Sequence, residues 1–80
     1  MHATNKIEIF TTPTCAYCKL AKDYFKSLSL PYEEYNVFID ETRRNEMIRI
    51  TGQMGVPVLR INGQVVLGFN KMMINKALGI

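Results

Sequence analysis

The sequence predicts an α/β protein in which three helices flank a four-stranded mixed sheet, in the order βαβαββα. Two observations support this fold class. Short runs rich in β-forming residues alternate with longer segments of helical apolar periodicity, and an Asn-Gly pair separates the last two short runs. Strands joined by a helical crossover pair in parallel, whereas strands joined by a two-residue turn pair antiparallel. The result is a mixed sheet whose faces are covered by helices.

The first strand and the first helix are predicted from residues 6–28. Residues Lys6–Thr11 alternate and are rich in β-formers, which indicates a strand. Residues Cys15–Leu28 contain no Gly or Pro, and Thr14 or Cys15 provides the N-cap region of a helix. The apolar stripe of this helix has the spacing that faces a core, and it comprises Leu20, Ala21, Tyr24, Phe25 and Leu28. The polar face carries Lys19, Lys22, Asp23 and Lys26.

A second strand and a second helix follow. The strand is predicted over Tyr32–Ile39, and one of its faces carries Tyr35, Val37 and Ile39. Asp40 is the expected N-cap of a helix over Glu41–Ile50, and Gly52 ends that helix. The solvated face of this helix is expected to carry Arg43, Arg44 and Arg49.

The last part of the chain predicts a hairpin and a helix. Residues Val56–Ile61 indicate a third strand, and Asn62-Gly63 is the strongest short hairpin signal that a sequence offers. Residues Gln64–Leu67 return as the fourth strand. Asn70 is placed to cap a final helix over Lys71–Leu78.

Length and composition restrict the class of protein. The 80 residues, 48% of them hydrophobic and 21% charged, are expected to form one domain over residues 1–80. No apolar run reaches the roughly 18 residues that span a bilayer, and the net charge of +3 comes without a Lys/Arg run, so we expect neither a membrane nor a nucleic-acid partner. The polar start, Met1–Asn5, lacks the apolar middle of a signal peptide. We therefore expect a cytoplasmic monomer.

Chemistry is expected at Cys15-Ala16-Tyr17-Cys18, between the first strand and the first helix. Two intervening residues put both cysteines on one face of the first helical turn, within reach of a disulfide. Unpaired N–H groups and the positive end of the helix dipole favour the thiolate of Cys15. We therefore predict that Cys15 is the nucleophile and that Cys18, one turn deeper and more buried, is the resolving thiol.

A Cys-x-x-Cys pair alone has other interpretations. Half of a zinc site has the same spacing, but a closed zinc site needs four ligands, and this chain adds only His2. We therefore expect no bound metal. Two inert core cysteines are a further alternative, but that alternative does not explain their placement at a helix start.

The chain resembles the glutaredoxins, a family of thioredoxin-fold oxidoreductases. The resemblance rests on the segment Phe10–Lys22 around the cysteines, on Gly55-Val56-Pro57, which is similar to the family's Thr-Val-Pro, and on Gly68-Phe69-Asn70, which is similar to the tail of its Gly-Gly-x-Asp motif. These motifs occur in the family's order, and the resemblance covers nearly the whole chain. The resemblance identifies the protein as closest to the small bacterial glutaredoxin-like proteins.

This resemblance implies a thioredoxin-like fold of the glutaredoxin type, with a cis proline at position 57 facing the cysteines. It also implies a substrate groove lined by Tyr17, Val56, Pro57, Gly68, Phe69 and Asn70. Glutathione is an expected co-substrate, and no cofactor is expected to be permanently bound. Taken without the resemblance, Pro57 reads as a strand-start proline, and Gly68 and Asn70 read as a turn and an N-cap.

Four positions depart from the family pattern. Thr12 stands where many glutaredoxins have a lysine, Leu67 replaces the first Gly of the Gly-Gly pair, and Asn70 replaces its Asp. Each change removes a charge or some space from the glutathione groove. We therefore expect glutathione to reduce this protein less well than a flavoprotein reductase does. Ala16 stands where the family commonly has Pro, which loosens the first helical turn.

The sequence thus predicts a dithiol–disulfide oxidoreductase that acts on protein disulfides or glutathione mixed disulfides. Its electrons are expected from glutathione or from a flavoenzyme of the thioredoxin-reductase type. One alternative is an iron–sulfur cluster carrier, in which the Cys15 residues of two chains and glutathione hold the cluster. A second alternative is a thioredoxin-fold adaptor that binds a partner without turnover.

Overall fold

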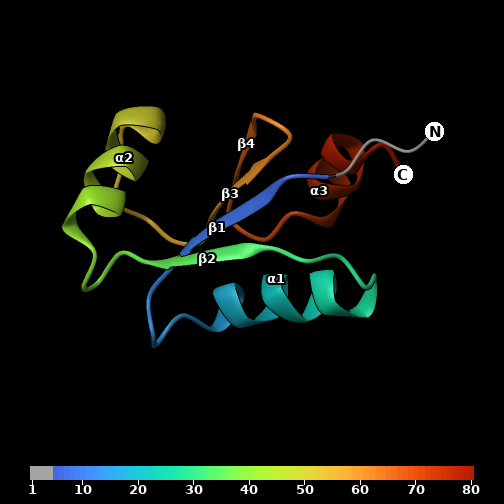
Figure 1. Cartoon of the computed structure of the whole chain (residues 1–80), viewed down its shortest axis with the longest axis horizontal. Coiled ribbons are helices and arrows are strands. Elements are labelled where there is room, and N and C mark those ends of the chain that lie inside the picture. Colours follow the sequence, from blue (N-terminus) through green and yellow to red (C-terminus); the bar gives the residue numbers. More distant parts are fainter. Residues whose placement is uncertain (1–4) are drawn as a thin grey trace.

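The computed structural model describes residues 5–80 and is organised around a four-stranded sheet with the strand order β2-β1-β3-β4 (Figure 1). The strands are β1 (Ile7–Thr11), β2 (Glu33–Asn36), β3 (Val58–Ile61) and β4 (Gln64–Leu67). Strand β1 pairs in parallel with β2 and antiparallel with β3, and β3 pairs antiparallel with β4. The helices are α1 (Ala16–Ser27), α2 (Glu41–Thr51) and α3 (Lys71–Leu78). The predicted element order and mixed sheet are confirmed; the polar start and His2 lie largely outside the described residues.

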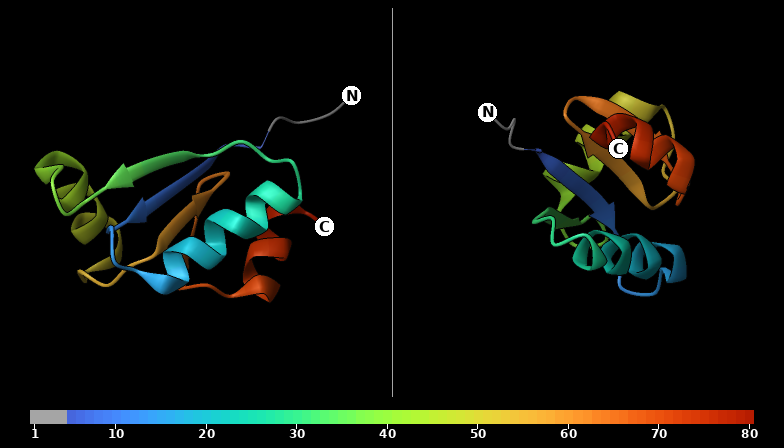
Figure 2. Two further views of the ribbon diagram at one scale, coloured as in Figure 1. Left: turned by 90° about the horizontal axis from the view of Figure 1, so that it is seen from below. Right: turned by 90° about the vertical axis from the view of Figure 1, so that its right-hand side faces the viewer.

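Strand β1 is buried along its whole length, because helices cover both faces of the sheet. Ile7 and Ile9 belong to the larger apolar cluster, which α1 and α3 complete with Phe25, Ile74 and Leu78. Phe10 points the other way, into a smaller cluster with Val37, Met47 and Val58. Figure 2 shows α1 and α3 next to each other, with α2 apart from them. Successive side chains of β1 therefore point into two different cores, and neither face of this strand is exposed to solvent.

Each helix begins at a residue whose side chain accepts a backbone hydrogen bond. Cys15 Sγ accepts from the N–H of Cys18, Asp40 from that of Arg43 and Asn70 from that of Met73. Helix α2 ends at Gly52, which has a φ of 72° in the left-handed region where glycine is favoured. These caps confirm the predicted helix ends to within one residue.

Strand β2 is shorter than predicted. It ends at Asn36, and residues 37–39 form a turn. The side chain of Asn36 accepts a hydrogen bond from the N–H of Phe38 at 3.0 Å, which is an Asx turn, and the Asn36 carbonyl accepts from the N–H of Asp40 at 2.9 Å. Val37 is buried but Ile39 is 76% exposed, so the predicted strand face that carries Tyr35, Val37 and Ile39 does not continue past Asn36.

The start of β3 and the buried side of α1 also differ from the prediction. Strand β3 begins at Val58 and not at Val56, because Pro57 has no N–H to donate to a ladder. On α1, Leu20 is 46% exposed, and Cys18 joins Ala21 and Phe25 on the buried side. The buried stripe is thus narrower than predicted and includes one of the two cysteines. Within residues 5–80, no helix has the length and apolar character needed to cross a membrane.

Candidate active site

The two cysteines lie at the start of α1 and form a disulfide, with their Cα atoms 5.2 Å apart. This distance lies within the range that a disulfide bridges without backbone movement. Cys15 is the N-cap, partly exposed, and its Sγ accepts a hydrogen bond from the Cys18 N–H at 3.1 Å. Cys18 is only 1% exposed. The prediction that Cys18 is the more buried of the two is confirmed.

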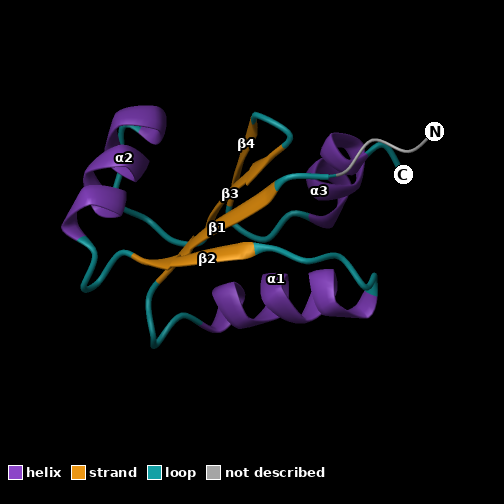
Figure 3. Ribbon diagram, in the orientation of Figure 1, coloured by secondary structure: helices purple, strands orange, loops and turns teal. Residues whose placement is uncertain are grey.

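The sheet brings Val56 and Pro57 beside the end of β1 that leads to Cys15. Phe10 pairs with Val58, so the residues that precede Val58 lie next to the residues that follow Phe10. Figure 3 shows the β1–α1 and α2–β3 loops at the same end of the sheet. Pro57 is buried, Val56 is half-buried, and the peptide bond between them is cis, as predicted.

A hydrogen bond joins Pro57 to the third motif. The N–H of Gly68 donates to the carbonyl of Pro57 at 2.9 Å, which brings the turn after β4 next to the proline. Pro57 and Gly68 flank the β3–β4 hairpin, and the pairing of β3 with β1 puts both at the end of the sheet where β1 leads to Cys15.

The remaining predicted groove residues have different environments. Tyr17 is 63% exposed. Phe69 packs edge-to-face against Tyr24, with 6.1 Å between ring centroids, at the border of the larger core. The Asn70 side chain accepts a hydrogen bond from the Met73 N–H at 3.1 Å and so caps α3. Phe69 and Asn70 thus have structural roles in addition to any contact with substrate.

A small apolar cleft beside Thr12 was not predicted. It has a volume of about 290 Å³ and is lined by Thr12, Val37, Phe38, Arg44, Met47 and Met54. Phe38 and Met54 are both highly exposed. The combination of Asn36 as a turn former and Asp40 as a helix cap was the signal that Phe38 lies in a loop.

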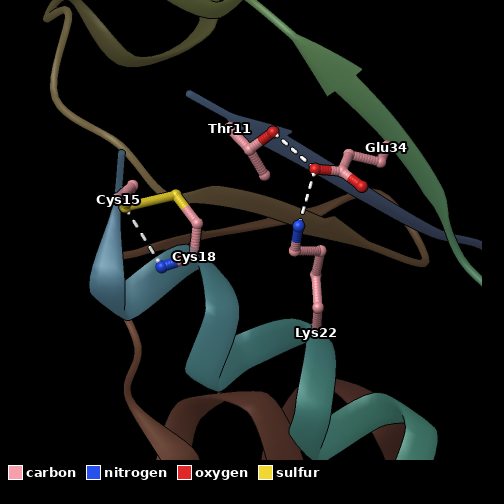
Figure 4. The surroundings of a disulfide bond; sticks show 5 residues. All are labelled: Thr11, Cys15, Cys18, Lys22 and Glu34. Atoms are coloured by element: carbon pink, nitrogen blue, oxygen red, sulfur yellow. Dashed lines mark hydrogen bonds and ion pairs between the residues drawn. A yellow bond between two sulfur atoms is a disulfide. The ribbon is translucent and has the colours of Figure 1, made fainter. Parts of the chain in front are cut away.

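Lys22, Glu34 and Thr11 form a second feature that sequence reasoning missed (Figure 4). Lys22 Nζ donates to Glu34 Oε2 at 3.0 Å, and the buried Thr11 hydroxyl donates to the same oxygen at 2.8 Å. Burial opposes ionisation of Glu34, but the hydrogen bonds from Lys22 and Thr11 outweigh it and lower the pKa of the carboxyl. The disulfide therefore lies beside a fixed ion pair between α1 and β2.

An ionic cluster lies between the sheet and α2. Arg60 binds Glu8 through two hydrogen bonds, of 2.7 and 2.9 Å, and also donates to Glu46 at 2.9 Å. The hydrogen bond from Arg60 is the largest of the effects that lower the pKa of Glu8 to about 2. The pKa of Tyr35 is raised to about 12. The main cause is burial of the hydroxyl, and the second is the hydrogen bond that this hydroxyl donates to Glu8.

This cluster corrects the prediction of a solvated arginine face on α2. Arg43 donates to Glu46 at 2.8 Å, and its guanidinium lies 3.9 Å from the ring centroid of Tyr35. Arg44 donates to the carbonyl of Val37 at 2.9 Å. Only Arg49 of the three is exposed. No group of three or more His, Cys, Asp or Glu side chains gathers as a metal site within residues 5–80.

Comparison with known proteins places this geometry in a family. The Glutaredoxin family model matches residues 7–66. The chain is 44% identical over 70 residues to an uncharacterized glutaredoxin-like 8.6 kDa protein in the rubredoxin operon of Clostridium pasteurianum, an alignment that covers 88% of this chain and 93% of that protein. It is 34% identical over 62 residues to glutaredoxin 3 of Escherichia coli K12, covering 78% and 75% of the two chains.

Solved structures agree with the sequence relatives. The thioredoxin-like protein BC3987 superposes with a TM-score of 0.83 at 32% identity, covering 90% of this chain and 99% of that one. The glutaredoxin of Archaeoglobus fulgidus superposes with a TM-score of 0.82 at 19% identity, covering 91% and 85% of the two chains, and shows the shared fold. With its cysteine pair at the start of α1 and these matches, the chain belongs to the glutaredoxin family.

Proposed function

We propose that the protein is a dithiol–disulfide oxidoreductase that reduces protein disulfides or glutathione mixed disulfides through Cys15 and Cys18. The contrast between the two sulfurs carries the proposal. Cys15 is partly exposed and accepts a hydrogen bond from a helix N–H, whereas Cys18 is buried. A helix-start N–H stabilises a thiolate, and the thiolate is the attacking form of cysteine.

The reaction proceeds by two exchanges. In the reduced protein, the Cys15 thiolate attacks one sulfur of the substrate disulfide, and the second substrate sulfur leaves as a thiolate. The Cys18 thiolate then attacks Cys15 Sγ, which forms the Cys15–Cys18 disulfide and releases the first substrate sulfur as a thiolate. Two electrons pass from the protein dithiol to the substrate.

The substrate is proposed to lie along Tyr17, Val56, Pro57, Gly68, Phe69 and Asn70. The Val56 backbone is half-buried beside the end of β1 and is suited to pair with an extended peptide. The proposed electron donor is glutathione or a flavoenzyme of the thioredoxin-reductase type. The proposed setting is the cytoplasm, where thiols are kept reduced.

A capture experiment tests this function. Reduced Cys18→Ser protein is mixed with a glutathionylated peptide, and the products are identified by intact-mass spectrometry. Cys18→Ser is expected to retain a mixed disulfide on Cys15, whereas Cys15→Ser is expected to retain none. Capture by Cys15→Ser and not by Cys18→Ser would reverse the two roles. A brown, dimeric protein from anaerobic purification would instead support the cluster-carrier alternative.

A further inference from the structure

Strand β4 lies at one end of the sheet, so one of its edges has no neighbouring strand among residues 5–80. The ladder with β3 determines which backbone groups face that free edge. Gly68 donates to the carbonyl of Pro57 at 2.9 Å, and hydrogen-bonded pairs alternate with non-hydrogen-bonded pairs in an antiparallel ladder. Counted back from this pair, Val65 and Leu67 occupy non-hydrogen-bonded positions of the register. Their N–H and C=O groups therefore point outward, away from β3.

The side chains of β4 do not prevent pairing at this edge. Edge strands usually carry charged residues, prolines or bulges that keep other chains from pairing with them. The opposite edge strand, β2, begins with the exposed Glu33 and Glu34. In contrast, residues Gln64–Leu67 include no charge and no proline, and their register with β3 is unbroken. Val65 and Leu67 are exposed apolar residues, so this edge is suited to accept a further strand.

A cleft of about 330 Å³ lies beside the same edge, between β4 and α3. It is lined by Gln64, Val65, Val66, Met73 and Lys76. Met73 and Lys76 are exposed, and Lys76 has no ion-pair partner within residues 5–80. The right-hand view of Figure 2 shows the β3–β4 hairpin against α3. A strand added to β4 turns every second side chain toward this face of the sheet.

The charge of this part of the molecule is one-sided. All 7 Asp and Glu residues of the chain lie before residue 47. Residues 47–80 add only cations, which are Arg49, Arg60, Lys71 and Lys76. Arg60 is bound to two glutamates, but Lys71 and Lys76 are exposed on α3. The surface formed by β4 and α3 is therefore electropositive and favours an anionic partner.

A second copy of this chain fits the edge poorly. Two β4 strands paired about a twofold axis would put both α3 helices on one face of the joined sheet, with like charges facing each other. Pairing of β4 with the acidic β2 edge of another copy would match the charges. That contact is head-to-tail and does not close, so it would build open chains. A separate protein with an acidic segment meets neither difficulty.

We propose that the β4 edge and the cleft beside it form a docking site for an acidic, extended segment of a partner protein. The backbone of that segment pairs with Val65 and Leu67. One of its apolar side chains enters the cleft against Met73, and a carboxylate pairs with Lys76. Neither cysteine takes part, so this site goes beyond the proposed dithiol reaction. Because β4 leads directly into Gly68, a partner docked here is held next to the proposed substrate groove.

Hydrogen exchange at single amides, followed by NMR, tests this site in the oxidised protein. The probe is a short capped peptide in which valine and glutamate alternate at every second position, separated by threonines. Its control has lysine in place of glutamate. The N–H groups of Val65 and Leu67 are expected to exchange several-fold more slowly with the glutamate peptide, because pairing gives them acceptors. The Val66 N–H faces β3 and is the internal reference. The lysine peptide is expected to give no protection.

Charge reversal at two matched lysines tests the carboxylate contact. Lys76 lies in the last turn of α3 and Lys26 in the last turn of α1, so both have the same relation to a helix dipole. Lys76→Glu is expected to weaken binding of the glutamate peptide about two- to tenfold and to favour the lysine peptide. Lys26→Glu changes the net charge equally but lies outside the cleft, and it is expected to leave both peptides unaffected.

Three results would overturn the inference. One is the absence of protection at Val65 and Leu67 with the glutamate peptide. Another is equal protection by both peptides, or an equal effect of the two lysine variants, which would show that charge does not select the segment. The third is protection that rises with protein concentration in the absence of peptide, which would make a second copy the occupant. None of these results involves exchange at Cys15, so the proposed function is tested separately.

Discussion

The guanidinium of Arg60 on β3 donates hydrogen bonds to both carboxylate oxygens of Glu8 on β1, at 2.7 and 2.9 Å. The two residues are cross-strand partners in the sheet register. Glu8 is buried, and an ionised carboxylate at such a position is stable only when it is paired and hydrogen-bonded. The hydroxyl of Tyr35 also donates a hydrogen bond to the Glu8 carboxylate, at 2.8 Å.

This pairing predicts a loss of stability in acid. The pKa of Glu8 is lowered from 4.5 to about 2, so its contribution is complete above pH 4.5 and is lost as the pH falls toward 2. The difference corresponds to about 3 kcal/mol of the free energy of unfolding. Urea titrations of the oxidised protein between pH 7 and pH 2 measure it.

The control for this prediction is a second glutamate. Glu8→Gln is expected to lower the free energy of unfolding at pH 7 and to flatten its pH dependence below pH 4.5. Glu33→Gln, at an exposed position on the neighbouring strand, is expected to keep the steep dependence of the parent. Equal pH profiles for the parent and Glu8→Gln would show that other carboxyls cause the acid response.

The Glu8 cluster also marks a limit of sequence-based prediction. Local patterns predicted the strands and helix caps, because turn formers, cap residues and periodicity act over a few residues. The Glu8–Arg60 pair is 52 residues apart in the sequence, and nothing local in either residue specifies the other. Arg43 and Arg44 of α2 were predicted to be solvated for a similar reason, since the Tyr35 ring beside Arg43 and the Val37 carbonyl bound by Arg44 lie outside that helix.

Helix α1 offers a direct comparison between a buried and an exposed apolar residue. Both Phe25 and Leu20 were predicted to face the core, but only Phe25 is fully buried. Phe25→Ala is expected to destabilise the protein by about 3–5 kcal/mol through lost burial and a cavity. Leu20→Ala is expected to cost less than about 1 kcal/mol. Urea denaturation measures both, and a similar loss for the two would contradict this account of the core.

The two thiols of the reduced protein are expected to react at different rates. Cys15 is partly exposed and receives a helix N–H, whereas Cys18 is buried. Iodoacetamide near neutral pH is therefore expected to alkylate Cys15 several times faster than Cys18. Peptide mapping after short exposures gives the two rates. Equal rates would remove the basis for assigning Cys15 as the nucleophile.

The candidate site was predicted in part. The cysteines, the cis proline and the helix caps follow from short motifs, and the structure places them as predicted. The ion pair of Lys22 with Glu34 beside the disulfide was not predicted, because it joins side chains from two different elements. The lysines of α1 were correctly assigned to the polar face, but periodicity alone does not show that Lys22 of this face meets Glu34 of β2.

Thr12 is the position at which a single charge is expected to change the response to glutathione. It lies three residues before Cys15, lines the apolar cleft beside Arg44, and also lines a second cleft that Cys15 borders. A lysine here adds one exposed ion pair with a glutathione carboxylate, worth about 0.2–1 kcal/mol. Thr12→Lys is therefore expected to raise the efficiency of glutathione-coupled turnover by about 1.5- to 5-fold, mainly through KM.

The matched control is Gln64→Lys, which adds the same charge in the hairpin at the opposite end of the sheet. It is expected to leave glutathione-coupled turnover unchanged. Added salt is expected to reduce the gain of Thr12→Lys, because exposed ion pairs are screened. Two results together would contradict this prediction: the unmutated protein is reduced as fast by glutathione as by a flavoprotein reductase, and Thr12→Lys brings no gain. They would show that glutathione binding does not depend on a cation at this position.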